Sequence, residues 1–384
     1  MKTIITTKTI KTCAVVLLIL FNLTGTEGLR GNTGSEFHSA DSNQIPNVLN
    51  MISKQIRSNY ERIKSWEGKI EVVTDNIYKG AGAEKVFKTR TDGKGETPRT
   101  IINHREQIIE FCVDTDKGLI YTGYYPTKPL EYIDLESGRK LKANSRIVAS
   151  RRRSIVMPEY QIDCTADTMR DNVVMSHIAV KQARPKDSTC ASNTHPVFDP
   201  RECFVVGRPI WETFQRLLQH MELHGEVSVD GYALKVEERK NGNDMEYRIQ
   251  IPGKVSPTDY LFKTMVFSGN KGFNIISLET TDHNGKLFQR RTWNYDLVNG
   301  VYVPSKTAKQ IFERENGELR YEEQYTYKNL KVNQPIPVET FTYKNLGLEN
   351  GDKFIDKIEN KEYTYQDRKL IEVEKNKAPA KKNK

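Results

Sequence analysis

The stretch that decides the fold begins with YALKVEERKNGNDMEYRIQI at residues 232–251. Apolar residues occupy every second position on both sides of the turn signal Asn241-Gly242-Asn243-Asp244. Period-2 alternation is typical of a half-buried strand, and Asn-Gly supplies the positive φ angles that a tight hairpin needs. Alternating runs and turn signals continue to Tyr327. Residues 232–332 are therefore predicted to form one antiparallel meander.

The chain begins with a segment that has the form of a secretory signal peptide. Three lysines precede an apolar run from Cys13 to Leu23, and small residues lead to a candidate cleavage site after Gly28. The run is too short to span a bilayer, and no later segment approaches the roughly 18 apolar residues of a spanning helix. We expect cleavage of residues 1–28 and a periplasmic or secreted protein that is not transmembrane. An uncleaved N-terminal anchor is the alternative.

The net charge of +9 arises at the two ends of the chain. Residues 1–28 carry three Lys and one Glu, and residues 375–384 carry five Lys, which leaves 51 basic against 49 acidic residues in 29–374. A nearly neutral body gives no indication of a nucleic-acid partner. The basic tail, 375–384, is expected to be disordered, with contact to anionic lipid headgroups as the alternative.

Two amphipathic helices are predicted beside the sheet. Apolar residues recur every three or four positions from Ile45 to Ile63, and again from Trp211 to Met221 after Pro209. Residues 29–44 are rich in Gly, Ser and Asn and are expected to be flexible. One domain over residues 45–374 is expected, because the early strands and the meander can share one sheet.

Strands are also predicted before the meander. The first runs from Trp66 to Val72, where apolar and charged residues alternate, and less regular strands are expected near 84–91, 98–103, 107–113 and 118–124. Alternation fades in residues 138–205, where a partly helical insertion held by cross-links is expected. Near the C-terminus, Phe341–Tyr343 is predicted as an edge strand, and Phe354–Tyr365 as a strand pair or extended arm.

Four cysteines remain after the predicted cleavage: Cys112, Cys164, Cys190 and Cys203. An even number in an exported protein indicates disulfides, and three pairings are open. Cys190–Cys203 is preferred because it would cross-link a turn-rich segment. A zinc site is the weaker alternative, because the chain has no Cys-x-x-Cys spacing.

No motif in the chain predicts a catalytic mechanism, a metal site or a cofactor. His220 and His224 are one helical turn apart, but Met221 stands where a metalloprotease needs Glu. We interpret this pair as part of an exposed helix end. Arg151-Arg152-Arg153 is interpreted as a solvated face, with binding of an anionic headgroup as the alternative.

Aromatic residues give the main indication of function. A sheet with one apolar face and only two or three covering helices can leave a groove that suits acyl chains and other apolar ligands. The alternative is that the same residues form an ordinary packed core. The candidate groove residues are Trp66, Ile70, Trp211, Phe214, Leu218, Tyr260, Phe262, Trp293 and Tyr295.

The layout resembles the periplasmic lipoprotein-carrier superfamily (LolA/LolB-like). The resemblance is carried by NYERIKSWEGKIEV at residues 59–72, where a helix gives way to a strand at Trp-x-Gly, and by the meander. FDPRECFVVGRPIWE (198–212) and LGLENGDKFIDKIENKEYTY (346–365) look like uncharacterised exported proteins of planctomycete-type bacteria. The resemblance implies an α+β fold, an incomplete antiparallel barrel whose concave face is covered by helices and holds acyl chains.

Three functions are weighed on this basis. The first is a non-catalytic binding protein of the cell envelope that holds a lipid, an acylated protein or another apolar ligand. The second is a structural or sensory protein with a filled core, which contacts an envelope protein through an edge strand or the C-terminal arm. The third is a hydrolase with an unrecognised pair of carboxylates.

Overall fold

The computed structural model describes residues 36–143, 147–169, 177–183, 210–256 and 259–373. The predicted signal peptide (1–28), the basic tail (375–384) and the preferred disulfide Cys190–Cys203 lie outside the described residues. Of the segment 29–44, the described part includes β1 (His38–Ser39), which pairs with Glu237 and Glu238, and the short helix η2 (Ser42–Gln44).

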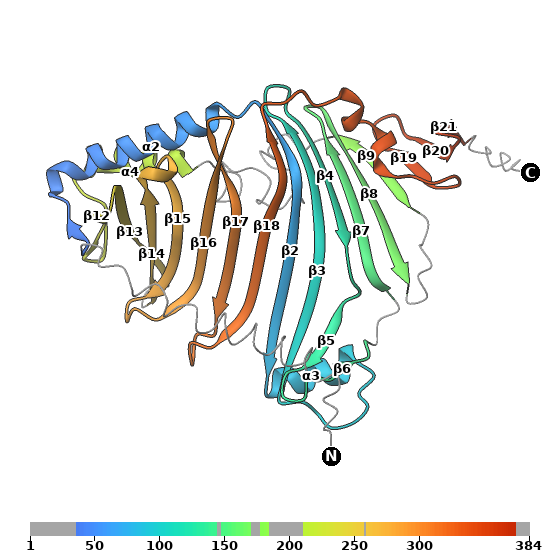
Figure 1. The fold of residues 1–384 in the computed structure, drawn as a ribbon, viewed down its shortest axis with the longest axis horizontal. Coiled ribbons are helices and arrows are strands. Elements are labelled where there is room, and N and C mark those ends of the chain that lie inside the picture. The colour runs from blue at the N-terminus through green and yellow to red at the C-terminus, as the bar shows by residue number, and fades with distance from the viewer. Residues whose placement is uncertain (1–35, 144–146, 170–176, 184–209, 257–258, 374–384) are drawn as a thin grey trace, which may run out of the picture.

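One large curved sheet dominates the molecule, and its two ends do not pair in the described residues (Figure 1). This confirms the predicted α+β class with an unclosed antiparallel sheet. Neighbouring strands pair antiparallel except β9 and β19, which are parallel. From one edge to the other the strands are β1 (His38–Ser39), β12 (Lys235–Asn241), β13 (Asp244–Ser256), β14 (Asp259–Ser268), β15 (Asn274–Asp282), β16 (Leu287–Val298), β17 (Val301–Phe312), β18 (Leu319–Val332), β2 (Ser65–Lys79), β3 (Thr100–Asp114), β4 (Leu119–Pro126), β7 (Ile147–Val156), β8 (Tyr160–Met169), β9 (Ile178–Ala183), β19 (Lys353–Asp356), β20 (Lys361–Gln366) and β21 (Lys369–Glu372).

Smaller elements lie beside this sheet. β5 (Glu131–Asp134) pairs with the first part of β3, and β6 (Lys140–Leu141) pairs with β5. β10 (Ser228–Val229) and β11 (Tyr232–Ala233) form a separate hairpin. The predicted meander is confirmed as β12 to β18, because each of these strands pairs with the next along the chain.

The sheet has an inner face, defined by Trp66 and Ile70, and an outer face, defined by Glu67 and Cys112. Residues that alternate along a strand point to opposite faces, and residues directly opposite in the ladder share one. Helices α2 (Ile45–Glu61) and α4 (Ile210–His224) pack on the inner face over the β12 to β17 end (Figure 1). The two predicted amphipathic helices are thus confirmed where the sheet needs a cover.

Direct contacts attach α2 to both α4 and the sheet. The rings of Tyr60 and Trp211 stack with their centroids 6.2 Å apart. Asn59 is buried, and its amide donates to the Tyr302 carbonyl (3.0 Å) while its Oδ1 accepts from the Tyr302 N–H (2.9 Å). Because a buried amide is costly unless it is hydrogen-bonded, this pair fixes where α2 lies on β17.

The C-terminal segment packs on the outer face at the opposite end of the sheet. Its helical turns η5 (Val338–Phe341) and η6 (Tyr343–Leu346) precede β19. Together with the outer face they form an outer cluster, whose buried members are Leu119, Tyr121, Ile155, Ile162, Cys164, Ala179, Phe341, Leu346, Leu348, Phe354 and Tyr365. The segment is therefore an integral layer of the fold and not a detached arm.

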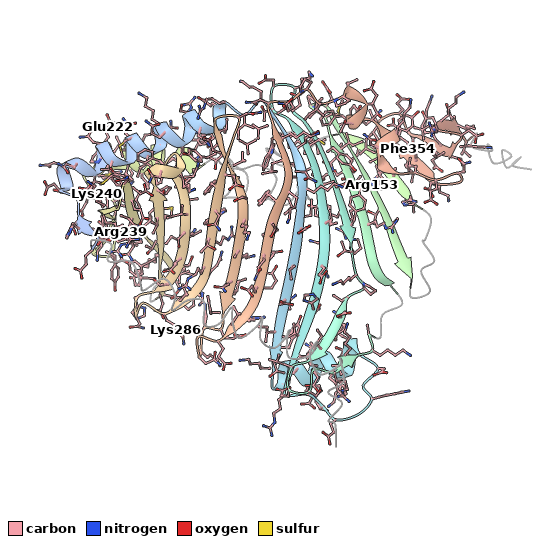
Figure 2. All side chains as sticks on the ribbon, viewed as in Figure 1. Arg153, Glu222, Arg239, Lys240, Lys286 and Phe354 are labelled. Atoms are coloured by element: carbon pink, nitrogen blue, oxygen red, sulfur yellow. The ribbon has the colours of Figure 1, made fainter. Side chains whose placement is uncertain are left out.

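Arg153 is held in this outer layer. Its Nε donates to the Tyr125 hydroxyl (2.8 Å), and its guanidinium lies 5.1 Å from the Tyr125 ring centroid. A Cβ at Gly347, which ends η6 with φ of 62°, would overlap that guanidinium. Figure 2 shows Arg153 and Phe354 at the same end of the sheet. Arg151 and Arg152 are exposed, whereas Arg153 is only partly exposed.

The expectations for residues 138–205 and 84–91 are wrong in the described residues. The described parts of residues 138–205 form β6, β7, β8 and β9. The arginine run hides the alternation of β7, because it places charge on both faces of that strand. Residues 81–90 form α3 (Ala81–Arg90), whose Ala83 and Phe87 are one turn apart and buried.

Two shorter predictions also change. The strands expected at 98–103 and 107–113 are one continuous strand, β3. The edge strand expected at 341–343 is replaced by η5 and η6, while the strand pair expected within 354–365 is present as β19 and β20.

Candidate functional site

The inner face carries most of the candidate groove residues in one packed cluster, here called the inner cluster. Its aromatic rings are in direct contact: Trp66 lies 4.5 Å from Phe111, and Phe214 lies 5.5 Å from Phe267, measured between centroids. Seven of the nine candidates belong to this cluster or pack against it: Trp66, Ile70, Trp211, Phe214, Leu218, Trp293 and Tyr295.

The other two candidates lie elsewhere. Tyr260 and Phe262 alternate with Leu261 and Lys263 on β14 and therefore point to the outer face. Their rings pack against Tyr232, at centroid distances of 5.2 and 5.0 Å. The prediction grouped all nine as aromatic and aliphatic side chains of one groove, and only the register of β14 against its neighbours separates Tyr260 and Phe262 from the rest.

Helix α4 leaves an apolar margin at the edge of the inner cluster. Ile210, Trp211 and Phe214 are buried, whereas the margin, defined as Leu217, Leu218 and Met221, packs against the cluster but is only partly buried. Unbranched Met adapts its shape to different partners, and margins of this kind can admit an apolar ligand without disrupting a core.

A polar strip crosses the inner face on β16, β17 and β18 within this apolar surface. It is defined by Arg291, Thr307, Lys309, Tyr321, Glu323 and Tyr325. Lys309 is directly opposite Arg291 on one side and Glu323 on the other. Directly opposite side chains have Cβ atoms about 4.5–5.5 Å apart, so these three charges are neighbours.

Burial differs along the strip, because Glu323 and Tyr325 are buried whereas its other four residues are partly exposed. Burial is the main cause that lowers the pKa of Lys309, and the Arg291 charge adds to it, while Glu323 opposes it. Burial also raises the pKa of Tyr321 and of Tyr325, and the Glu323 carboxylate raises both further. Glu323 itself is 6% exposed.

Sequence reasoning missed this strip. Scattered charges in a meander are usually solvated, and none of these residues forms a local motif. The alternation along each strand could have revealed it, because residues two positions apart point to the same face. Arg291 therefore shares its face with Trp293, and Glu323 shares its face with Tyr325. The same alternation that predicted the strands therefore placed the charges on the covered face.

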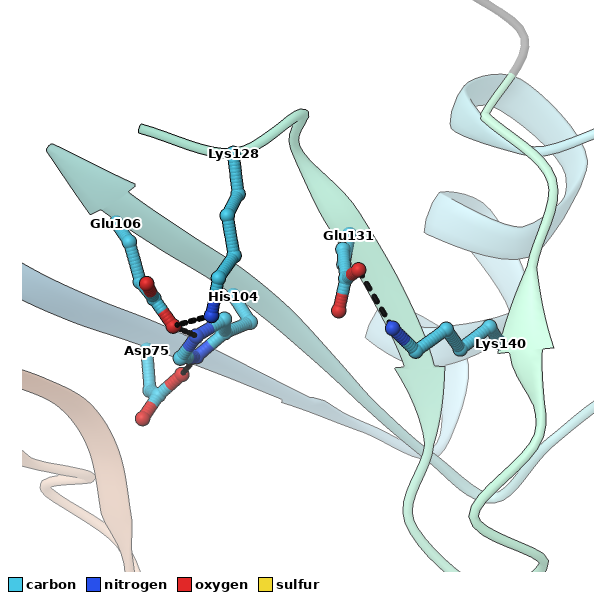
Figure 3. A network of polar contacts seen from close by, with 6 residues as sticks. All are labelled: Asp75, His104, Glu106, Lys128, Glu131 and Lys140. Carbon is cyan, nitrogen blue, oxygen red and sulfur yellow. Dashed lines mark hydrogen bonds and ion pairs between the residues drawn. The ribbon is translucent and has the colours of Figure 1, made fainter. Parts of the chain in front are cut away.

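A second polar network lies on the outer face (Figure 3). His104 Nδ1 is 2.7 Å from Asp75 Oδ1, and Nε2 is 3.2 Å from Glu106 Oε1, which also accepts from Lys128 at 2.7 Å. Both ring nitrogens of His104 are engaged, so neither is free to take a proton from a substrate. We interpret the network as a structural link between β2 and β3.

This network predicts a pH-dependent contribution to stability. The hydrogen bond to Asp75 is the main cause that raises the pKa of His104 above 6.5, and Glu106 adds to the rise while burial opposes it. A raised pKa in the folded state means that the contribution is complete below the unfolded value and is lost as the pH rises through the folded value. His104→Asn should therefore lower the free energy of unfolding more at about pH 5.5 than at about pH 8.5.

Urea unfolding at both pH values measures this difference. The matched control is His283→Asn, at an exposed turn position. An equal loss for His104→Asn at the two pH values would show that protonation of His104 does not stabilise the fold.

The described cysteines are not cross-linked. Cys112 and Cys164 are free thiols, and each has its pKa raised to about 12 by burial, with Glu67 adding to the shift at Cys112. The thiolate is the reactive form, so both are poor nucleophiles at neutral pH. A disulfide between these two candidates is absent from the described residues, and those pairings that need Cys190 or Cys203 stay predictions.

The described part of the chain contains no cluster of three or more His, Cys, Asp or Glu that could hold a metal ion. His220 and His224 lie on α4 with ring centroids 4.4 Å apart, without a third ligand among the described residues. None of the described helices is long and apolar enough to cross a membrane.

A pocket of about 420 Å³ opens on the outer face between β8 and the C-terminal segment. Its polar part is an internal ion pair, in which Lys181 Nζ lies 2.8 Å from Asp356 Oδ2 and 4.9 Å from the Tyr160 ring centroid. The Lys181 amine is thus already held by Asp356 and the Tyr160 ring. We therefore interpret the pocket as a gap between two packed layers and not as a binding site.

No protein-family model matches the chain, and no curated protein matches it. Similar solved structures include a DUF1329 family protein from Desulfovibrio piger ATCC 29098, with a TM-score of 0.32 and 11% identity, over 80% of this chain and 100% of that one.

Two further solved structures are similar to this chain. The LolA superfamily protein NE2245 from Nitrosomonas europaea has a TM-score of 0.32 and 10% identity, over 78% of this chain and 99% of that one. A putative outer membrane lipoprotein-sorting protein domain from Vibrio parahaemolyticus has a TM-score of 0.29 and 10% identity, over 78% and 97%.

Proposed function

We propose that this chain is a non-catalytic, exported binding protein of the cell envelope. It holds a lipid, an acylated protein or another apolar ligand between the inner face of the sheet and helices α2 and α4. The observation that carries the proposal is the apolar margin of α4, where Leu217, Leu218 and Met221 pack on the inner cluster while keeping part of their surface accessible.

The energetics favour an acyl chain at this margin. Each CH₂ group that leaves water contributes about 0.8 kcal/mol, so a chain that covers half-exposed leucines needs no reactive group to bind. Transfer would require only that the margin of α4 separates slightly from the sheet. The filled part of the inner cluster then serves as the fixed floor of the site.

A single substitution in the margin tests this proposal. Leu218→Gln keeps a side chain of similar size but presents a polar group to the ligand, so it should reduce the fraction of purified protein that carries an amphiphile in native mass spectra. Leu223→Gln on the same helix is the matched control, because Leu223 is 77% exposed and lies outside the inner cluster.

The control for folding is a urea titration of both variants. If Leu218→Gln retains its stability and carries as much ligand as Leu223→Gln, the α4 margin is not part of the binding site.

The second candidate function is a structural or sensory protein with a filled core, and one observation favours it. The inner cluster packs aromatic rings at 4.5 to 5.5 Å, as a filled core does. A protein with a filled core would interact with an envelope partner through its surface. A ligand-free inner face in native mass spectra would favour this function.

A further inference from the structure

A row of polar side chains crosses the inner face on β4, β7 and β8, away from α2 and α4 (Figure 1). Thr122 lies directly opposite Phe111 of the inner cluster on one side and Ser154 on the other. Ser154 in turn lies directly opposite Asp163. Directly opposite residues share a face and have Cβ atoms about 4.5–5.5 Å apart. Thr122, Ser154 and Asp163, here called the Thr–Ser–Asp row, therefore continue the inner cluster with hydrogen-bonding groups.

Two members of the row are hydrogen-bonded to each other. The Ser154 hydroxyl donates to Asp163 Oδ1 at 2.8 Å, and the Gln161 amide donates to Asp163 Oδ2 at 2.9 Å. A hydroxyl has one proton to donate and two lone pairs that can accept. Because the Ser154 proton is directed to Asp163, Ser154 Oγ has only lone pairs left to offer to a further group.

Thr122 is the member without a hydrogen bond. Its side chain is 0% exposed, and its Oγ1 has no hydrogen-bond partner in the described structure. A buried hydroxyl that makes no hydrogen bond destabilises a fold, whereas valine would fill the same space without that cost. The hydroxyl at this position therefore points to a partner that comes from outside the chain.

The row leads from solvent to this buried hydroxyl. Asp163 and Ser154 are partly exposed, whereas Thr122 is buried. A group that enters beside Asp163 therefore passes Ser154 before it reaches Thr122.

The free hydrogen-bonding capacity of the row selects the chemistry of that group. Thr122 offers a proton and Ser154 offers lone pairs, so the group has to accept and donate at once. A phosphate or a carboxylate only accepts, and the Asp163 carboxylate would repel it. An ammonium group only donates, which would leave the Thr122 proton without an acceptor. A hydroxyl meets both requirements.

We propose that the Thr–Ser–Asp row binds the hydroxyl-rich head, a glycerol or a sugar, of the amphiphile that the inner face carries. One hydroxyl of the head donates to Ser154 Oγ and accepts from Thr122 Oγ1, and a neighbouring hydroxyl donates to Asp163. The acyl chain continues onto the inner cluster beside Phe111. The inference rests on the proposed carrier function and names its ligand class, an amphiphile with an uncharged polyol head.

Competition with a fluorescent acyl probe tests this on the full mature chain. Three competitors share a twelve-carbon acyl chain: the methyl, glycerol and sucrose monoesters of dodecanoic acid. The measured quantity is the affinity for each polyol ester divided by the affinity for the methyl ester, because this ratio cancels the contribution of the acyl chain. The variant is Thr122→Val, which removes the hydroxyl and keeps the shape. The matched control is Thr292→Val, at an exposed position on the outer face of β16.

The ratio for one or both polyol esters should fall about threefold to tenfold in Thr122→Val relative to the wild type. The affinity of this variant for the methyl ester should stay unchanged. Its thermal stability should not fall, because the substitution removes a buried hydroxyl that has no partner. Thr292→Val should keep the wild-type ratios. The ester with the larger fall identifies glycerol or sugar as the head that the row binds.

Three results would contradict the proposal. Unchanged ratios in Thr122→Val, or equal falls in Thr122→Val and Thr292→Val, overturn the inference and leave an apolar carrier. A loss of stability in Thr122→Val shows that the hydroxyl has a partner within the fold, which overturns the inference in the same way. No binding of any ester to the wild type overturns both the inference and the carrier function.

Discussion

Replacing Trp66 by alanine should lower the free energy of unfolding by about 3–5 kcal/mol. Trp66 is 1% exposed, and it contacts Phe111 at 4.5 Å and Tyr327 at 6.3 Å between ring centroids. The large value follows because three strands meet at this indole, and strands cannot move closer to fill the cavity. A domain is typically stable by about 5–15 kcal/mol, so the variant should be close to unfolding at physiological temperature.

Urea unfolding measures this effect, with Leu223→Ala as the control. Leu223 is 77% exposed, and its removal should change stability by no more than about 0.5 kcal/mol. A Trp66→Ala variant as stable as the control would mean that the inner cluster is loosely packed around this position.

Removing residues 335–384 should abolish the native fold. The buried side chains of Phe341, Leu346 and Phe354 would be lost, and Tyr121 and Ile155 on the outer face would be exposed to water. Each large apolar side chain contributes about 1.5–3 kcal/mol when buried, so the sum approaches the whole stability of a domain. The cut would also leave β9 as an unpaired edge, which promotes aggregation.

The shorter deletion of residues 375–384 is the matched control and should leave the unfolding curve unchanged. Circular dichroism and size-exclusion chromatography distinguish the two outcomes. A soluble, cooperatively unfolding chain that ends at Gln334 would show that the C-terminal segment is a separable arm, as the second function weighed from the sequence assumed.

Local sequence patterns predicted the fold correctly where they agree with the tertiary environment. The meander follows from alternation around Asn-Gly turns, and α2 follows from the apolar stripe that ends at Ile63. They failed at β7, where Arg151, Arg152 and Arg153 place charge on both faces of the strand and hide its alternation. They also failed at α3, where only Ala83 and Phe87 are buried and the stripe is too short to recognise.

Some residues of the candidate site could likewise be assigned from the sequence, and others could not. Trp66 and Trp293 could be assigned to a common cluster because apolar residues in phase on neighbouring strands tend to be buried together. Tyr260 and Phe262 could not be excluded without the register of β14. The pairing of Lys309 with Arg291 depends on strand register and on a bulge between Asn294 and Tyr295, neither of which alternation alone determines.

The most direct test of the central claim is the mass of the mature protein purified from producing cells without detergent and sprayed under non-denaturing conditions. The account predicts a species heavier than the chain by one amphiphile, which is released on denaturation, recovered in an organic extract, and depleted in Leu218→Gln relative to Leu223→Gln. A protein whose native mass equals that of the chain alone, with an extract free of acyl compounds, would contradict it.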